Sequence, residues 1–310
     1  MEVCIAPRTG LVLRNPLISA SGTMGYETEP RGGIRGAHFG AVVCKGTTLL
    51  PRRGNPPPRL LATFGGTLNF IGLANIGVEA LIARMAPMWA RWDTPVLVNV
   101  SGASIDEYRW LALRLDGVSG IAGVELNISC PNVERGIEFG VDPDLAGAVT
   151  RAVREETGLP LIVKLSPNVT DIRPVARAVE EAGSDAISLI NTVSGTSVDA
   201  RTATSVSGGL SGPAVKPVSL RMVEQVAREV SIPVIGIGGI SSAKDVIEFL
   251  LAGATAVEIG TALLADPGCY QHILADLTRW MRRNHVSDWS QIVGRPRTPN
   301  AEIREMAREV

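Results

Sequence analysis

The sequence predicts a single α/β domain folded as a (β/α)8 TIM barrel, and three observations lead to that prediction. Its 310 residues are enough for one large domain with a core of its own. Eight short runs rich in Val, Ile and Leu recur without polar alternation, which is typical of strands buried on both faces. Amphipathic helical segments occupy most of the gaps, and strand–helix alternation repeated eight times is the pattern of this barrel.

Each of the eight candidate strands ends at a polar residue or at a glycine. In chain order the strands are Leu17–Ala20, Ala41–Cys44, Val96–Val98, Val124–Leu126, Leu161–Val163, Ala186–Ile190, Val234–Ile237 and Ala256–Ile259. The residues that follow them are Ser21, Lys45, Asn99, Asn127, Lys164, Asn191, Gly238 with Gly239, and Gly260 with Thr261. Barrel active sites lie at the carboxyl ends of the strands, so we expect these residues to converge on one pocket.

Helices are predicted in seven further segments: Val78–Trp92, Ser104–Leu115, Asp142–Thr157, Asp171–Ala182, Pro213–Val230, Ser242–Ala252 and Asp266–Arg283. The expected N-caps are Ser104, Asp142, Asp171 and Ser242, and the expected helix-ending glycines are Gly158, Gly183 and Gly253. A first helix, somewhere in Pro30–Ala37, is poorly defined. An open doubly wound sheet is the alternative, but the chain has no GxGxxG turn, and the eight-fold count favours the barrel.

Three segments lie outside this repeat. Glu2–Arg14 is expected to form a hairpin around Pro7–Gly10 that closes the bottom of the barrel. Gly46–Gly77 and Thr192–Gly212 are too long for simple turns, and long loops in compact domains are often active-site lids or partner surfaces. No linker appears, so we expect residues 1–310 to form one domain.

Composition excludes several classes of function. A net charge of -1 leaves no basic excess for nucleic acid. The four cysteines form no CxxC pair, so no metal site is expected in this chain. The start has no signal-peptide pattern and no long apolar window occurs, so we expect a cytoplasmic chain without a membrane span. With three histidines and no GxSxG elbow, a serine hydrolase is poorly supported.

The strand-end residues allow both a functional and a purely structural interpretation. Asparagine and glycine often end strands because turns begin there, whereas a lysine at the end of a buried strand needs an anionic partner or a functional reason. The glycines after the last two strands fit either a phosphate site or simple helix-entry turns. Cys130, in NISCPNV, is a candidate nucleophile or general base, although a lone cysteine is more often a small buried apolar residue.

A series of ordered motifs between about Pro16 and Asp266 resembles a known family. These include NPLISASGTMG (15–25), CKGTTLLPRRGNPPPR (44–59), LNFIGLANIGV (68–78), ELNISCPNV (125–133), VKLSPNVTDI (163–172), GGLSGPAVKP (208–217) and IPVIGIGGI (232–240). With them the chain resembles the catalytic subunit of class 1 dihydroorotate dehydrogenases, flavoenzymes of pyrimidine synthesis. The stretch from about Gln271 onward carries little of this resemblance.

The resemblance implies a (β/α)8 barrel that binds FMN at the carboxyl ends of its strands. It implies FMN contacts with Ser21, Lys45, Gly46, Asn99, Asn127, Lys164, Ile190, Gly212, Gly238, Gly239, Gly260 and Thr261. It implies substrate contacts with Lys45, Asn69, Phe70, Ile71, Gly72, Leu73, Asn127, Asn132, Asn191 and Thr192. Cys130 matches the family's catalytic base: the flavin takes a hydride from C6 of dihydroorotate while the thiolate takes the C5 proton. Lys164 would stabilise charge on the reduced flavin.

The resemblance is greatest for the NAD-linked type, class 1B, because GLANIGVEAL follows LNF. This type implies a homodimeric core that joins an FAD and 2Fe–2S electron-transfer subunit in a heterotetramer. Cys130 argues against the membrane-bound class, which uses serine. The fumarate-linked class 1A and a related dihydropyrimidine oxidoreductase stay open, the latter because Phe70 replaces a usually small residue; Ile76 also stands where proline is common. The alternative from a different functional class is a non-catalytic barrel that binds a phosphate-bearing ligand as an assembly subunit.

Overall fold

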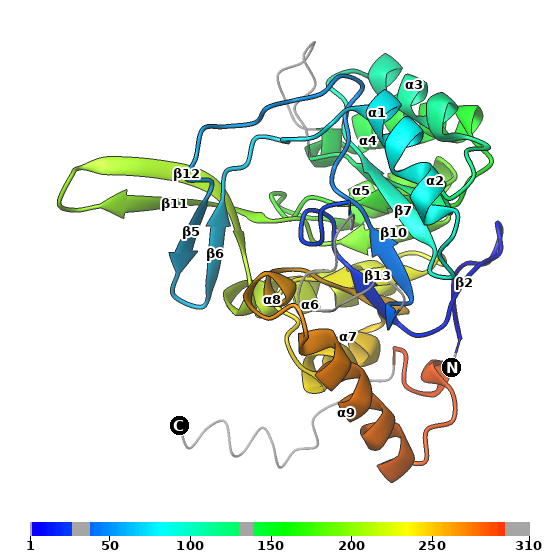
Figure 1. Cartoon of the computed structure of the whole chain (residues 1–310). Helices are drawn as coiled ribbons and strands as arrows, with labels where there is room; N and C mark the ends of the chain where they lie inside the picture. Colours follow the sequence, from blue (N-terminus) through cyan, green and yellow to red (C-terminus); the bar gives the residue numbers. More distant parts are fainter. Residues whose placement is uncertain (1, 27–37, 130–138, 295–310) are drawn as a thin grey trace.

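The computed structural model describes residues 2–26, 38–129 and 139–294, and it contains a closed parallel barrel of eight strands (Figure 1). In order around the barrel these are β3 (Leu17–Ser19), β4 (Ala41–Val43), β7 (Val96–Val100), β8 (Gly123–Asn127), β9 (Leu161–Lys164), β10 (Ala186–Leu189), β13 (Val234–Ile237) and β14 (Ala256–Ile259). β14 pairs with β3 and so closes the ring. Every apolar run singled out in the sequence is one of these strands, so the predicted barrel is confirmed.

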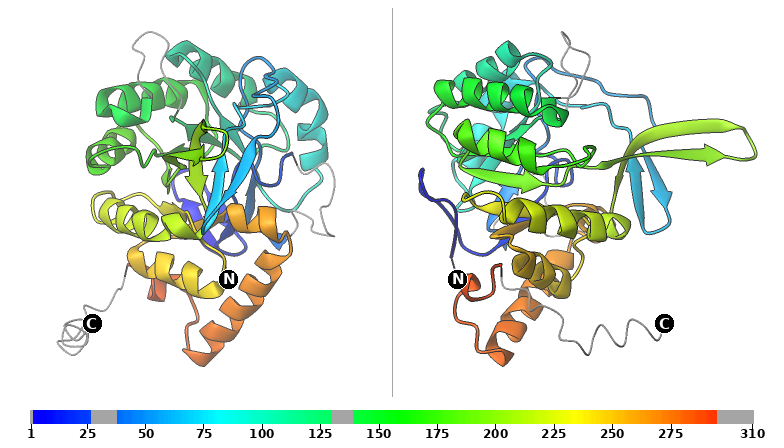
Figure 2. Two further views of the ribbon diagram at one scale, coloured as in Figure 1. Left: turned by 90° about the vertical axis from the view of Figure 1, so that its left-hand side faces the viewer. Right: turned by 180° about the vertical axis from the view of Figure 1, so that it is seen from behind.

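Helices surround the barrel, as Figures 1 and 2 show. They are α1 (Val78–Arg84), α2 (Ala86–Trp89), α3 (Ile105–Leu115), α4 (Pro143–Glu156), α5 (Arg173–Glu181), α6 (Lys216–Ala227), α7 (Ala243–Ala252), α8 (Thr261–Ala265) and α9 (Cys269–Arg283). Short 3-10 turns occupy Phe139–Val141, Pro213–Val215 and Trp289–Gln291. Within the described residues, no helix combines the length and apolar character needed to cross a membrane.

Three predicted caps are confirmed, because the side chains of Ser104, Asp142 and Ser242 accept hydrogen bonds from the first turns of α3, α4 and α7. Asp171 does not cap α5, which begins at Arg173. Instead, its carboxylate accepts from the Arg173 backbone N–H and pairs with the Arg173 side chain.

Other helix boundaries also depart from the prediction. The predicted helix Val78–Trp92 breaks at Met85, since Pro87 has no N–H to continue the hydrogen-bond ladder. The last helix begins at Cys269 rather than Asp266, and the short α8 before it was not predicted. Gly183 and Gly253 adopt the expected positive φ after α5 and α7, whereas α4 ends in extended backbone at Thr157. The predicted helix in Pro30–Ala37 lies outside the described residues.

The N-terminal hairpin is confirmed as β1 (Val3–Ala6) paired antiparallel with β2 (Leu11–Leu13). Arg8, in its turn, pairs with Asp185 at 2.8 Å and donates a hydrogen bond to the Gly183 carbonyl. Both partners directly precede β10, so the hairpin lies against the amino-terminal end of the barrel. It therefore closes the bottom, opposite the face where the strands end.

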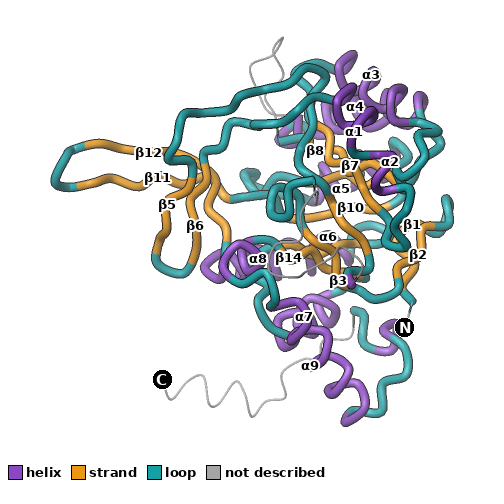
Figure 3. The backbone as a smooth tube through the Cα atoms, in the orientation of Figure 1, coloured by secondary structure: helices purple, strands orange, loops and turns teal. Residues whose placement is uncertain are grey.

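The two long connections form a second, four-stranded antiparallel sheet that was not predicted. Its strands are β5 (Leu60–Thr63), β6 (Gly66–Asn69), β11 (Val193–Asp199) and β12 (Thr204–Ser211), in the order β11-β12-β6-β5. Figure 3 shows both hairpins projecting together from the barrel. A Cβ on Gly208 would lie 2.2 Å from the Asn69 carbonyl oxygen, so β12 approaches β6 this closely only because residue 208 is glycine.

Candidate active site

A cavity of about 1010 Å³ opens at the carboxyl ends of the barrel strands. Its walls come from the strand-end turns and from the second sheet, so segments far apart in sequence share one space. Every described residue that was predicted to bind cofactor or substrate lines it: Ser21, Lys45, Gly46, Asn69, Phe70, Ile71, Gly72, Leu73, Asn99, Asn127, Lys164, Ile190, Asn191, Thr192, Gly212, Gly238, Gly239, Gly260 and Thr261. Cys130 and Asn132 lie outside the described residues. The convergence is therefore observed, while each residue's role stays a prediction.

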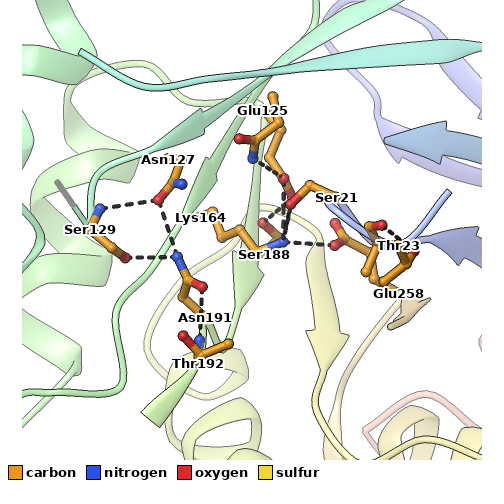
Figure 4. Close-up of polar contacts among 12 residues, drawn as sticks. Ser21, Thr23, Glu125, Asn127, Ser129, Lys164, Ser188, Asn191, Thr192 and Glu258 are labelled. Atoms are coloured by element: carbon orange, nitrogen blue, oxygen red, sulfur yellow. Dashed lines mark hydrogen bonds and ion pairs between the residues drawn. The ribbon is translucent and has the colours of Figure 1, made fainter. Parts of the chain in front are cut away.

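Lys164 reaches from the end of β9 into an acidic cluster inside the barrel (Figure 4). Its Nζ lies 3.0 Å from Glu258 Oε2 and 3.3 Å from Glu125 Oε2. Burial lowers the pKa of Lys164, but the charges of Glu125 and Glu258 outweigh that effect and leave the pKa raised. The buried lysine therefore has the anionic partners that its position required.

Glu125 and Glu258, which contact Lys164, and Ser188, which contacts Glu125, were not predicted from the sequence. The available signal was a glutamate inside each of two otherwise apolar strands, VELN and VEIG. Ser188, on β10, donates a 2.9 Å hydrogen bond to Glu125. Burying a carboxylate without partners is costly, so an acid in a barrel strand predicts a cation nearby.

The orientation of the Asn99 side-chain amide is set from inside the barrel. Its Nδ2 donates a 2.6 Å hydrogen bond to Glu125 Oε2. Its Oδ1 therefore points toward Gly46, where an added Cβ would lie 3.0 Å from it. Asn99 thus presents its Oδ1 as an acceptor at the cavity wall, and Gly46 leaves room for it.

A second amide network orients Asn127 and Asn191. Asn191 Nδ2 donates to Asn127 Oδ1 at 3.1 Å and to Ser129 Oγ at 2.9 Å, while its Oδ1 accepts from the Thr192 N–H at 2.8 Å. Both faces of the Asn191 amide are therefore occupied. Asn127 keeps its NH2 group without a partner among the described residues, so it can donate to a ligand in the cavity.

The part of the cavity wall that follows β13 and β14 contains glycines and hydroxyl groups. Gly238 and Gly239 follow β13 with φ of 125° and 74°, and Gly260 precedes α8. A Cβ on Gly239 would lie 2.6 Å from the Lys216 Cβ, so the close approach here requires glycine. Lys216 itself is held by Asp245 at 2.6 Å and Glu248 at 2.9 Å. Thr261 Oγ1 donates to Ser211 Oγ at 2.8 Å, so this part of the cavity is lined by glycines and hydroxyl groups rather than by a lysine.

Lys45 is the second cation of the cavity. Among the described residues it forms no ion pair and no side-chain hydrogen bond. Burial, and secondly the positive charge of Arg59, lower its pKa. An unpaired, partly buried ammonium in the same cavity as the free Asn127 NH2 group suits an anionic ligand. Within the described residues, no group of three or more His, Cys, Asp or Glu side chains is arranged to hold a metal ion.

Comparison with known proteins places these features in context. A family model described as dihydroorotate dehydrogenase matches residues 7–281. A protein of Pelobacter propionicus named dihydroorotate dehydrogenase B (NAD(+)), catalytic subunit, is 52% identical over 290 residues, covering 92% of this chain and 95% of that protein. The protein of that name in Desulforudis audaxviator is 51% identical, covering 92% and 94%. The crystal structure of a DHODH from Eimeria tenella in complex with ferulenol superposes with a TM-score of 0.80 at 21% identity, covering 94% and 87%, which supports the fold alone.

Proposed function

The chain belongs to the dihydroorotate dehydrogenase family, and from this premise we propose that it is the catalytic subunit of an NAD-linked enzyme that oxidises dihydroorotate to orotate in pyrimidine biosynthesis. Relatives of about half-identical sequence carry that name and match along nearly their whole length. The observation that carries the proposal is the single cavity in which Lys45, Lys164 and the strand-end asparagines meet.

The described residues fit FMN. The cavity volume of about 1010 Å³ leaves room for a flavin nucleotide with a small substrate. Gly238, Gly239, Gly260 and Thr261 would hold the phosphate through N–H and hydroxyl groups, and the close contact between residue 239 and Lys216 requires glycine at this position. When bound, FMN supplies the hydride acceptor.

The remaining cofactor contacts that we propose surround the ring system. Ser21, Asn99 and Lys164 would meet its polar edge, where Lys164 supplies positive charge and Asn99 an acceptor. Lys45, Gly46, Asn127, Ile190 and Gly212 complete the proposed set. The acidic cluster fixes Lys164 and Asn99 before any ligand arrives, so little reorganisation is needed on binding.

The proposed substrate contacts use the free cation and the oriented amides. Lys45 would pair with the carboxylate of dihydroorotate, and the free Asn127 NH2 group would donate to its ring. Asn191, Thr192 and the Asn69–Leu73 segment complete the described part of the pocket wall. We further propose that the Cys130 thiolate accepts the C5 proton and that Asn132 contacts substrate.

The electron acceptor is proposed from the names of the relatives. The relative from Pelobacter propionicus is named a catalytic subunit of an NAD(+) enzyme, and this name supports a partner subunit that passes electrons to NAD. We propose that this partner carries FAD and a 2Fe–2S cluster, and that a homodimeric core joins two partner chains in a cytoplasmic heterotetramer. Co-expression of this chain, carrying an affinity tag, with the proposed partner subunit tests this. An iron–sulfur flavoprotein should co-purify with the tagged chain, and NAD should then serve as electron acceptor.

Anaerobic reduction of the purified protein tests the activity itself. A yellow protein whose flavin absorbance bleaches on adding dihydroorotate supports the proposal. Phe70 lines the cavity, so dihydrouracil and dihydrothymine are the informative comparison substrates. Bleaching by these alone would instead assign a dihydropyrimidine oxidoreductase, and reoxidation by fumarate rather than through a partner would assign the class 1A type. A colourless protein that binds no flavin would overturn the proposed function and both of these alternatives.

A further inference from the structure

Two glutamates and one lysine meet inside the barrel just below the cavity. Glu125 lies on β8, Glu258 on β14 and Lys164 at the end of β9, and of the three only Lys164 borders the cavity. Their side chains are at most 5% exposed. The cluster therefore contains two acids for one base, in surroundings where an unbalanced charge is costly.

The two carboxyl groups differ sharply in the partners that surround them. Glu125 accepts from Asn99 at 2.6 Å and from Ser188 at 2.9 Å, in addition to its contacts with Lys164. Glu258 Oε2 lies 3.0 Å from Lys164 Nζ. If Glu258 were ionised, its Oε1 would have no hydrogen-bond donor among the described residues. A buried, unpartnered carboxylate oxygen is destabilising, whereas a carboxylic acid at this position can donate its proton to Glu125.

The surrounding charges also favour a proton on Glu258 rather than on Glu125. Burial raises the pKa of Glu125, but the Lys164 charge and hydrogen bonds from Glu258, Asn99 and Ser188 outweigh it, so the pKa is lowered. Burial and then the charge of Glu125 raise the pKa of Glu258 well above its usual value. Two adjacent carboxyl groups that share one site do not both ionise readily.

We propose that Glu258 is a neutral positioning residue that holds the one proton shared by the two glutamates. Lys164 thereby stays charged, while the cluster beneath the cavity carries no net charge. The inference rests on the proposed function, because it concerns the surface on which the flavin would lie. With Glu258 neutral, the cluster has one positive and one negative charge, and its positive member faces the cavity. With Glu258 ionised, the cluster would carry a net negative charge and would oppose electron transfer into a ligand above it.

Infrared spectroscopy of the purified holoprotein in D2O at neutral pH tests the protonation state directly. The wild type should show the C=O stretch of a protonated carboxylic acid, and Glu258→Gln should lose it. Glu125→Gln should lose it as well, because Glu258 then becomes the only carboxylate beside Lys164 and ionises. Asp245→Asn is the matched control: Asp245 is paired with Lys216, so the band should remain. Absence of the band in wild type, or its survival in either Gln variant, overturns the proposal.

A second measurement needs no variant to fold. Across a pH range in which the circular dichroism spectrum stays native, the wild-type band should persist well above the pH at which an ordinary glutamate ionises, and a band already lost by neutral pH contradicts the shared proton. Where Glu258→Gln is obtained, the midpoint potential of bound flavin should fall less steeply at alkaline pH than in wild type. Equal slopes would overturn the effect on the cavity. Neither readout uses dihydroorotate, so an inactive protein that shows the band refutes the proposed function alone.

Discussion

Asn99 donates a 2.6 Å hydrogen bond to the buried carboxylate of Glu125, so an acid inside the barrel decides which atom of a strand-end amide faces the cavity. The same carboxylate accepts from Ser188 and contacts Lys164. One residue that never borders the cavity thus orients two residues that do. The binding surface is therefore specified partly by the layer of side chains beneath it.

Asn99→Asp should weaken flavin binding through that contact. The substitution replaces a donor with a second carboxyl group facing Glu125, which removes a hydrogen bond to a charged group and adds repulsion. A loss of about 1–3 kcal/mol corresponds to about 5- to 150-fold weaker FMN binding. Fluorescence titration of apoprotein with FMN measures it. Asn284→Asp, at the exposed end of α9, is the control, and equal affinities for the two variants would contradict the assignment.

Gly239→Ala should reduce flavin retention for a steric reason. Its φ of 74° disfavours a side chain, and an added Cβ would lie 2.6 Å from the Lys216 Cβ. The backbone must shift, and the proposed phosphate cradle shifts with it, so we expect FMN to bind about tenfold more weakly or worse. Gly117→Ala is the matched control, since Gly117 has a φ of 69° with nothing within 4 Å of an added Cβ. It should cost about 1 kcal/mol of stability and leave FMN binding intact. Similar FMN loss in both variants would show that strain alone is responsible.

The strand-end residues could be predicted because the physics that places them is local. A run such as Ala256–Ile259 is apolar on both faces, so it must be a buried strand, and parallel strands in a barrel bring their carboxyl ends together. Lys45 and Lys164 were conspicuous because lysine does not simply end a buried strand. Their convergence on one cavity followed from topology alone.

Other features could not be predicted because their stabilising partners are remote. Glu125 and Glu258 are tolerable in the core because both contact Lys164, which lies 39 and 94 positions away in the sequence. β11 and β12 were missed because their Ser, Thr and Gly residues are mostly half-exposed and show no apolar pattern. They become strands by pairing with each other and with β6, which is a tertiary relationship.

Lys45→Met should raise the KM for dihydroorotate by about 10- to 150-fold, because it removes a charged partner of the substrate carboxylate. The pH dependence tests the same contact. Burial and the charge of Arg59 lower the pKa of Lys45, and only its ammonium form binds an anion. In the wild type, KM should therefore rise with increasing pH sooner than an ordinary lysine would allow. Steady-state kinetics across neutral to alkaline pH measure both effects.

Arg59→Gln separates this contact from a general effect of charge. Removing the repulsion from Arg59 should raise the pKa of Lys45, so the rise in KM should move to higher pH. Arg53→Gln, which removes an exposed arginine from the same segment, should leave the profile in place. A profile that moves equally in both variants would argue that the net charge of the segment, not a direct pair, controls KM.

Cys130→Ser should slow flavin reduction strongly while FMN stays bound, because a serine hydroxyl gives up its proton far less readily than a thiol. Stopped-flow mixing with dihydroorotate under anaerobic conditions measures the rate. In the wild type the rate should rise with pH as the thiolate forms, toward the pKa of a free thiol, which is about 8.5. Cys269→Ser is the control inside the same cavity: burial, and secondly the charge of Asp266, raise the pKa of its thiol to about 11, so it stays protonated and cannot serve as base. Normal reduction in Cys130→Ser, or a comparable loss in Cys269→Ser, would remove the proposed proton acceptor.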